Sequence, residues 1–531
     1  MQRSHRRDSR GDALQILRCF VNPFKKLLSA ALTSALTLPV LSFSAAATSI
    51  DGRIVETNSN LPIAGAFVTL GDSSVRTDKN GAFHIEGDGT ELRARAYGYK
   101  RGALSLAPAA ATTAETAPAD AQTADMAAPA DTDKPAAGGE QPGAEPATQA
   151  DQPATVADSS GPAAATVRAP AAQNSGASAA PSRTAPVTLQ LEPFTPRGIY
   201  LSSYGISSLK LRNAALDLVH NTQINTFVID VKTDSALVTQ KSAVPLAKEI
   251  GAQKIVLKKD LPELIAKLHA QGIYTIARIV TFKDTLLAQA HPEWAIKTAD
   301  GKIFRDNEGL AWVDPFVTQV WDYNVALARE AAQMGFDEIQ FDYVRFPDKR
   351  GLVFSKPNTE QNRVAAINGL LTEARATLRP YNVFLAADIF GYVCWNQNDT
   401  EIGQRIEDIM QHVDYASPML YPSGFQFGIP GYRNPVESSN QIVYRTLENA
   451  RARTHVDPVR FRPWLQAFRD YAFDRRQFGQ DEIQQQISAA ERFGSNGWLL
   501  WNPRNVYAAA DIKRATPALT AENEEKSSAM R

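Results

Sequence analysis

From residue 197 to about residue 503, short apolar runs alternate with longer stretches in which apolar residues recur at helical spacing. The short runs are rich in β-branched and aromatic residues, which is typical of strands, and the longer stretches are typical of amphipathic helices. Predicted helices include residues 261–270, 317–334, 363–378 and 482–493. The eight predicted strands are residues 198–202, 226–230, 274–280, 335–342, 383–388, 415–421, 463–468 and 497–501.

Eight strands separated by helices predict an α/β fold of the (β/α)8 TIM-barrel type, which we place at residues 196–510. A doubly wound open sheet is the alternative arrangement of the same elements. No glycine-rich nucleotide-binding loop follows the first strand, so the pattern favours the barrel.

The N-terminal part of the chain has a different pattern. In residues 49–107, short segments of alternating apolar and polar residues are separated by turn sequences such as Asn58-Ser59-Asn60 and Lys79-Asn80-Gly81. This pattern predicts a small all-β sandwich. Residues 108–186 are mainly Ala, Pro, Thr, Gly, Asp and Gln with few large apolar side chains, and we expect this segment to be disordered. We expect the same of residues 516–531.

Residues 62–66, 77–83 and 96–100 resemble the carboxypeptidase regulatory-like family. The resemblance implies a module that packs or binds rather than one that catalyses, and a partner in the cell envelope is the kind of partner that we expect for it. It also implies one more strand, and residues 187–192 fit it. The low-complexity segment would then be a long insertion in the last hairpin, because long loops add closure entropy only slowly. An ordinary linker between domains is the alternative.

The first 48 residues read as a targeting segment. Basic residues precede an apolar run at residues 27–43, and the small residues 44–47 follow it. This is the order of a secretory signal, which predicts a periplasmic or secreted protein; an uncleaved anchor is the alternative. We expect no stable membrane span after removal of the signal, because the apolar run is short and contains Pro39.

Charge and cysteine content narrow the classes of function. The formal net charge is -1, so the chain lacks the excess of basic residues that is typical of nucleic-acid-binding proteins, and we expect no nucleic-acid partner. Of the two cysteines, Cys19 lies in the predicted signal, so Cys394 has no partner for an intramolecular disulfide in the mature chain. The His residues are scattered and no Cys-x-x-Cys pair occurs, so we expect neither a metal nor another cofactor.

Polar residues recur where the predicted strands end, which is where the chemistry of a (β/α)8 barrel takes place. In the fourth strand, alternation puts Glu338, Gln340 and Asp342 on one face, with Asp342 at the C-terminal end. The residues that we expect at the mouth, in chain order, are Asp230, Lys232, Arg278, Asp342, Arg345, Asp388, Tyr421, Gln466, Trp501 and Asn502. Aromatic faces together with planar polar groups suit a sugar, so these positions predict a polysaccharide or oligosaccharide substrate.

The segments around these residues resemble bacterial putative glycoside hydrolase domains, which are related to glycosyl-hydrolase-10-like and α-amylase-like barrels. The resemblance is carried by residues 197–200, 228–232, 312–316, 335–347 and 386–392. It implies that Asp342 matches the nucleophile that ends the fourth strand in α-amylase-like barrels. The fifth-strand acid of those barrels is a Glu, whereas this chain has Asp388, and Gln340 replaces an arginine. These differences argue against a true amylase mechanism.

Glycoside hydrolysis needs one ionised and one protonated carboxyl group. We assign Asp342 as the nucleophile or base, with Arg278 or Lys232 favouring its ionised form, and Asp388 as the acid. Asp230 is the competing catalytic acid. The remaining mouth residues are assigned to substrate binding. The alternative function is an inactive carbohydrate-binding or scaffold protein of the cell envelope; a lyase or a deacetylase fits less well.

Overall fold

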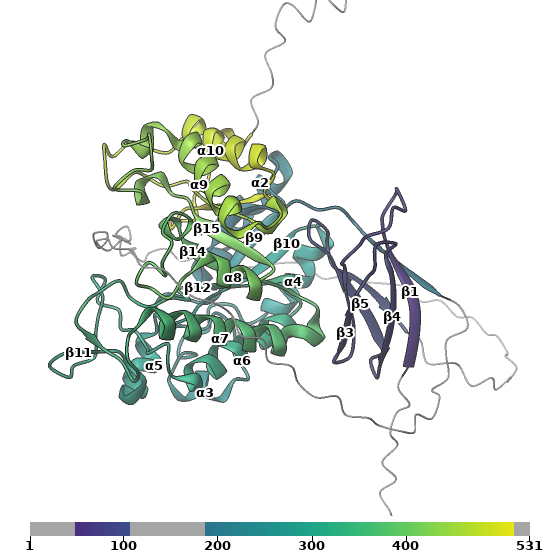
Figure 1. Ribbon diagram of the computed structural model, residues 1–531, viewed down its shortest axis with the longest axis horizontal. Helices are drawn as coiled ribbons and strands as arrows, with labels where there is room; N and C mark the ends of the chain where they lie inside the picture. Colours follow the sequence, from purple (N-terminus) through teal and green to yellow (C-terminus); the bar gives the residue numbers. More distant parts are fainter. Residues whose placement is uncertain (1–47, 107–185, 514–531) are drawn as a thin grey trace, which may run out of the picture. The chain divides into compact units, whose positions relative to one another are not determined.

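The computed structural model describes residues 48–106 and 186–513 (Figure 1). The predicted signal, low-complexity segment and C-terminal tail lie outside these ranges, except for Thr48 and Pro186 at their edges. All described residues belong to one compact unit, Ala46–Arg531. They form a small β-sandwich and a closed barrel surrounded by helices.

The sandwich consists of two sheets, with strand orders β4-β1-β7 and β3-β2-β5-β6. Alternate residues such as Ile54, Val68 and Leu92 are fully buried between the sheets, as the alternating pattern predicts. β7 pairs in parallel with β1, with Val187 opposite Gly52, so the strand expected after the low-complexity segment lies in the first sheet. The strands are β1 (Thr48–Glu56), β2 (Phe67–Leu70), β3 (Ser73–Arg76), β4 (Ala82–Gly87), β5 (Glu91–Arg95), β6 (Gly102–Ser105) and β7 (Val187–Leu191).

The eight barrel strands pair in parallel throughout, and β17 pairs with β8 to close the ring. The (β/α)8 barrel is therefore confirmed, and closure excludes the doubly wound open sheet. The strands, in barrel order, are β8 (Arg197–Leu201), β9 (Thr226–Lys232), β10 (Tyr274–Val280), β12 (Glu338–Asp342), β14 (Phe384–Phe390), β15 (Tyr415–Met419), β16 (Trp464–Gln466) and β17 (Trp498–Trp501).

Helices surround the barrel strands (Figure 1). Their apolar faces and the outer faces of the strands share one buried core. The longer helices are α2 (Leu209–Asn221), α4 (Leu261–Ala270), α6 (Thr318–Gln333), α7 (Glu360–Leu378), α8 (Ile406–His412), α9 (Ser439–Thr454) and α10 (Gln480–Phe493). The shorter ones are α1 (Ser203–Ser207), α3 (Pro245–Glu249), α5 (Thr285–Ala290) and α11 (Ala509–Ile512), and a two-stranded sheet joins β11 (Lys297–Thr298) to β13 (Leu352–Val353).

The barrel interior is filled by large side chains rather than left open. One cluster there contains Tyr200, Tyr274, Phe384, Tyr415 and Trp464, all of them buried. Polar side chains between these rings are paired: Arg462 donates to Glu338, and Gln340 Nε2 donates to Ser417 Oγ at 3.0 Å. Glu338, four residues before Asp342 on the same face of β12, is thus an interior acid with a cation beside it.

The amino-terminal end of the barrel carries contacts with the sandwich. Asp414, which precedes β15, is fully buried; it accepts from Leu385 N at 2.9 Å and pairs with Arg95 of β5 at 3.2 Å. Tyr97 packs edge-on against Tyr415, with ring centroids 5.9 Å apart. In (β/α)8 barrels the amino-terminal end contributes to stability, whereas catalytic residues lie at the opposite, carboxyl-terminal end of the strands. The contacts with the sandwich therefore leave the carboxyl-terminal end accessible.

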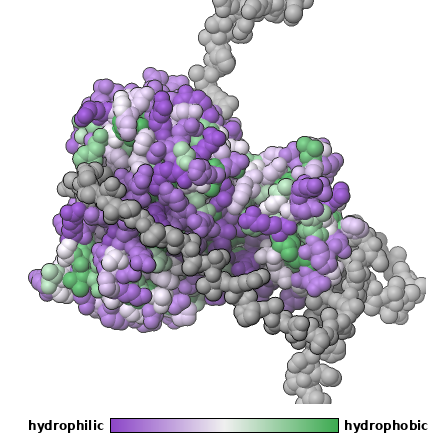
Figure 2. Space-filling model, in the orientation of Figure 1, coloured by the Kyte–Doolittle hydropathy of each residue, from purple (hydrophilic) through white to green (hydrophobic). Residues whose placement is uncertain are grey.

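The exposed face in Figure 2 is mainly hydrophilic, with small dispersed hydrophobic patches. In the ranges that the structure describes, no helix combines the length and the apolar character needed to cross a membrane.

Gly497 lies where β17 approaches β8 to close the barrel, and we predict that this position tolerates no side chain. Gly497, just before β17, has φ +77°, and a Cβ built there would overlap the carbonyl oxygen of Pro196, which accepts a hydrogen bond from Trp498 N at 3.1 Å. We expect Gly497→Ala to lower the free energy of unfolding by about 3 kcal/mol or more. Gly272→Ala is the control, because Gly272 has φ +75° but open space around it, and it should cost about 1–2 kcal/mol. Equal losses in urea unfolding would contradict the clash.

Candidate active site

Asp342 ends β12 with its side chain inside the barrel. It is 7% exposed. The next residue, Tyr343, has φ +48°, an uncommon conformation for a residue with a side chain, and its N–H donates to Asp342 Oδ1 at 2.6 Å. The strand therefore ends in a tight left-handed step whose amide holds the carboxylate in place.

Arg278 of β10 lies at the centre of a cluster of acids. Its guanidinium donates to Asp342 Oδ2 through Nε at 2.9 Å and through Nη2 at 2.7 Å. Nη1 donates to Asp230 Oδ1 at 2.7 Å, and Nη2 also reaches Asp234 Oδ1 at 3.0 Å. Arg278 is only 1% exposed, so its charge-assisted hydrogen bonds to the buried Asp230 and Asp342 are shielded from water, whereas the side chain of Asp234 is partly exposed. One cation thus joins three carboxylates from β9, the loop after it and β12.

Asp230 is held on its other side by Tyr200 of β8, whose hydroxyl donates to Oδ2 at 2.6 Å. Burial raises the pKa of Asp230 to about 6, although Arg278 and the Tyr200 hydrogen bond act in the opposite direction. The proximity of Asp234 adds to the rise. Asp230 therefore titrates near neutral pH, and its two oxygens are already engaged by neighbouring side chains.

Asp388 lies on β14, the strand next to β12. Ala387 pairs with Phe341, so Asp388 and Asp342 follow paired residues on neighbouring strands. Burial raises the pKa of Asp388 well above its usual range, and the negative charge of Asp342 adds to the effect. The opposing contribution comes first from Trp464, whose indole N–H donates to Asp388 Oδ1 at 2.7 Å. Asp388 is thereby favoured in its protonated form.

Aromatic rings surround the carboxyl groups. Trp501, half-buried at the end of β17, stacks on Tyr200 with centroids 3.9 Å apart, and Trp464 meets it edge-on at 5.4 Å. The guanidinium of Arg278 lies 4.9 Å from the Trp501 ring centroid. Tyr421 is 7% exposed; burial raises the pKa of its hydroxyl, and the nearby charges of Asp388 and Asp342 add to the rise. Both predicted aromatic residues thus accompany the acids.

Lys232 is a correction to the predicted site. Its ammonium group is fully buried, pairs with Asp284 at 2.7 Å and donates to Asn324 Oδ1 of α6 at 2.9 Å. The cause is a β-bulge: Arg278 pairs with Asp230, but the next residue of β10, Ile279, pairs with Lys232. The extra residue turns Lys232 to the helix-facing side of the strand, so its side chain lies away from the acid cluster where it was expected.

Gln466 and Asn502, which were predicted to bind substrate, form hydrogen bonds with the loops at the ends of their strands. Gln466 is fully buried, donates to Ser423 Oγ at 2.6 Å and accepts from Ser423 N at 3.0 Å. Asn502 donates to the carbonyl oxygens of Ala467 at 2.7 Å and Val506 at 2.8 Å. Both amides hold the loops that follow the strands.

Arg345 likewise lies outside the acid cluster. Its guanidinium stands over Trp312, 5.0 Å from the ring centroid, and it donates to Phe346 O at 3.1 Å. β12 ends at Asp342 and the left-handed step at Tyr343 follows, so Arg345 lies beyond the regular strand. In the described parts of the chain, no group of three or more His, Cys, Asp and Glu side chains is arranged to hold a metal ion.

Tyr200 and Trp464 contact the acids and Asp234 contacts Arg278, but none of the three was assigned to the site. Strand alternation could have found two of them, because residues two apart on a strand point to the same face. Trp464 lies two residues before Gln466, which was predicted to lie at the mouth, and Tyr200 lies two residues after Gly198 on the first barrel strand. Asp234 lies in the loop after β9, where no periodicity places a side chain.

A protein-family model and several solved structures match parts of this chain. A model of the family described as "Putative glycosyl hydrolase domain" matches residues 198–507, which is more than half of the chain. Among solved structures, a hypothetical protein from Ruminiclostridium thermocellum is 37% identical over 36% of this chain and 96% of that chain, with a TM-score of 0.33. The glycoside hydrolase domain of PgaB (BpsB) from Bordetella bronchiseptica is 13% identical over 61% of this chain and 100% of that chain, with a TM-score of 0.44. A comparison with curated proteins found no match.

The acid cluster predicts a pH-dependent role for Arg278 in stability. Replacing it by Met leaves buried carboxylates without their cation, which should cost about 3–5 kcal/mol of unfolding free energy at neutral pH. The pKa of Asp230, about 6 in the native protein, should rise further because Arg278 lowers it. The folded variant then binds a proton that the unfolded chain releases, so its stability should increase as the pH falls from 8 to 5.

Urea unfolding of native protein and Arg278→Met at several pH values measures this deficit. The matched control is Arg345→Met, because Arg345 contacts an aromatic ring and a backbone carbonyl rather than a carboxylate. It should cost about 1 kcal/mol at every pH. A deficit for Arg278→Met that stays constant between pH 8 and pH 5 would contradict the electrostatic explanation.

Proposed function

Since the chain belongs to the putative glycosyl hydrolase domain family, we propose that it hydrolyses glycosidic bonds in a polysaccharide or cell-envelope glycan with Asp342 and Asp388. The observation that carries this proposal is the contrast between these two neighbouring carboxyl groups. Asp342 contacts the Arg278 cation, whereas Asp388 is buried beside an indole and its pKa is raised. Glycoside hydrolysis uses such a contrast, with one carboxylate and one carboxylic acid on opposite sides of the bond.

In the proposed mechanism, Asp388 gives its proton to the glycosidic oxygen as the bond to the anomeric carbon breaks. Among the described residues only Trp464 donates to Asp388, and it binds Oδ1, so Oδ2 is free to carry that proton. Asp342 acts at the anomeric carbon, directly as a nucleophile or by removing a proton from the attacking water. Asp388 recovers a proton when water completes the reaction in the first case, or from solvent in the second.

Arg278 and Tyr200 are positioning residues in this mechanism. Arg278 fixes the orientation of Asp342 by two hydrogen bonds to one oxygen. Tyr200 holds Asp230, which in turn binds Arg278. Trp501, stacked on Tyr200 and half-buried, is suited to contact a sugar ring. We also propose that this reaction takes place in the periplasm or outside the cell, which N-terminal sequencing of the native protein tests.

Replacing Asp342 by Asn tests the catalytic assignment. With any glycan that the native protein hydrolyses, we expect kcat/KM to fall about a thousandfold or more in Asp342→Asn, while glycan binding is retained. The matched control is Asp337→Asn, because Asp337 precedes the opposite end of β12 and binds His269 and Arg101 instead. Measurements should be made below the unfolding temperature of both variants.

The outcomes of these measurements separate the enzyme from an inactive carbohydrate-binding protein and test the role of Asp342. Loss of turnover in Asp342→Asn alone supports hydrolysis at this site. Binding to a glycan panel with no turnover in the native protein would favour the carbohydrate-binding alternative, and equal activity in native protein and Asp342→Asn would exclude Asp342 as the nucleophile or base.

Trp464 makes the pH dependence testable. Asp388 must be protonated to act as the acid, so kcat/KM should decline as the pH rises through its raised pKa. Trp464→Phe removes a hydrogen bond that lowers this pKa. The alkaline limb of the pH profile should therefore move to higher pH, by about one pH unit or less. Trp501→Phe is the control, and an alkaline limb that moves equally in both variants would contradict the assignment.

A further inference from the structure

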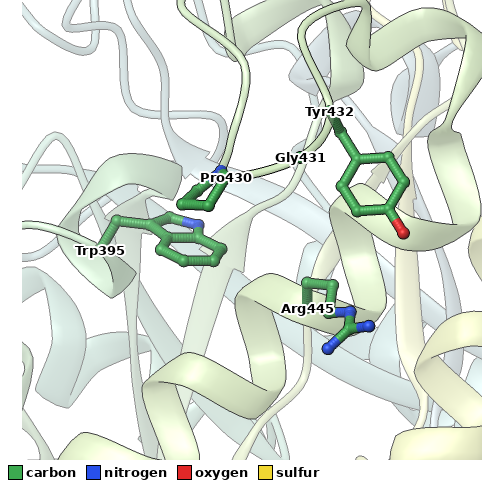
Figure 3. Close-up of a pocket in the computed structure, with 5 residues that line it drawn as sticks. All are labelled: Trp395, Pro430, Gly431, Tyr432 and Arg445. Carbon is green, nitrogen blue, oxygen red and sulfur yellow. The ribbon is translucent and has the colours of Figure 1, made fainter.

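A cavity outside the acid cluster lies among loops on the barrel. Its volume is about 460 Å³, and it is lined by Trp395, Pro430, Gly431, Tyr432 and Arg445. Figure 3 shows the indole of Trp395 on one side of the cavity and the side chains of Tyr432 and Arg445 on the other. Cavities in this range of volume hold small ligands.

The cavity is connected through the fold to the proposed active site. Trp395 follows η3 (Gly391–Cys394), which begins directly after β14, the strand of Asp388. Residues 430–432 belong to the segment between β15 and α9, which also contains Tyr421. Both segments start from carboxyl ends of barrel strands, so the cavity belongs to the same end of the barrel as the acids.

The lining is held in position before any ligand arrives. The indole N–H of Trp395 donates to Thr446 Oγ1 of α9 at 3.0 Å, which fixes the plane of the ring. Ile429 and Tyr432 exchange backbone hydrogen bonds of 2.8 and 3.1 Å, so a tight turn presents Pro430 and Gly431. A rigid aromatic wall lowers the entropy that a bound sugar costs.

Arg445 gives the cavity its charge. Its side chain is exposed, and among the described residues it forms no ion pair with a carboxylate. Other arginines of α9 do have acidic partners: Arg451 pairs with Glu448 at 3.7 Å, and Arg453 pairs with Glu407 at 2.8 Å. A guanidinium beside two aromatic rings combines a partner for a carboxylate with a surface for a sugar ring.

We propose that this cavity binds an anionic sugar, a uronic acid residue whose carboxylate pairs with Arg445 while its ring lies against Trp395. The inference rests on the proposed function, since it makes the cavity a binding site for a charged residue of the glycan substrate away from the cleaved bond. It narrows the substrate class to glycans that contain acidic sugars.

The test measures binding without turnover. D-Glucuronate and D-glucose, which differ in charge at one carbon, are titrated into the full chain carrying Asp342→Asn, with saturation-transfer NMR as the readout. We expect saturable binding of glucuronate that Arg445→Gln weakens about tenfold or more, as for the loss of a charge-assisted hydrogen bond. Trp395→Ala should weaken it as well. Arg451→Gln is the matched control on the same helix and should leave glucuronate affinity unchanged.

Equal affinity for glucuronate and glucose, unchanged glucuronate affinity in Arg445→Gln, or absence of saturable glucuronate binding would each overturn the proposal. The readout does not involve hydrolysis. Glucuronate binding lost in Arg445→Gln therefore supports the cavity even if Asp342 proves not to be catalytic, and a failed binding test leaves the assignment of Asp342 and Asp388 intact.

Discussion

The contact between one guanidinium and three carboxylates determines the arrangement of the barrel mouth. Arg278 is nearly inaccessible, and it binds Asp230, Asp234 and Asp342 at 2.7–3.0 Å. Burying Asp230 and Asp342 without a cation would be costly, because desolvation of each charge amounts to several kcal/mol. The same guanidinium orients Asp342 through two hydrogen bonds and lies 4.9 Å from the ring centroid of Trp501.

Regular strands made part of this cluster predictable. Asp230, Arg278, Asp342 and Asp388 were expected at the mouth because each lies at or near the end of a predicted strand, and all four lie on paired barrel strands. Lys232 was expected there as well, but the bulge in β9 shifts the alternation by one residue and turns its side chain away. A bulge is a property of the pairing between two strands, and the residues of one strand do not reveal it.

The polar residues of the loops show a second limit of sequence reasoning. A backbone that leaves a strand needs partners for its own N–H and C=O groups, and amide side chains supply them. Gln466 and Asn502 fill this need, so their position at strand ends has a structural cause. Trp464, by contrast, was not predicted and yet contacts a site residue. It lies 76 residues from Asp388 in the sequence but donates the hydrogen bond that opposes the rise in the pKa of Asp388. Only the closed barrel brings the two together.

The two ends of the barrel contain similar residue types but different partners. At the amino-terminal end, Asp414 has Arg95 beside it, and in the interior Glu338 has Arg462. At the mouth, Asp388 forms no ion pair with any of the described residues and accepts one hydrogen bond, from Trp464. A buried carboxyl group without a cation weakens the folded state at neutral pH, because folding then favours the bound proton. Such a local conflict between burial and charge is what a site for acid catalysis requires, and a purely structural acid would be expected to have the cation that Asp388 lacks.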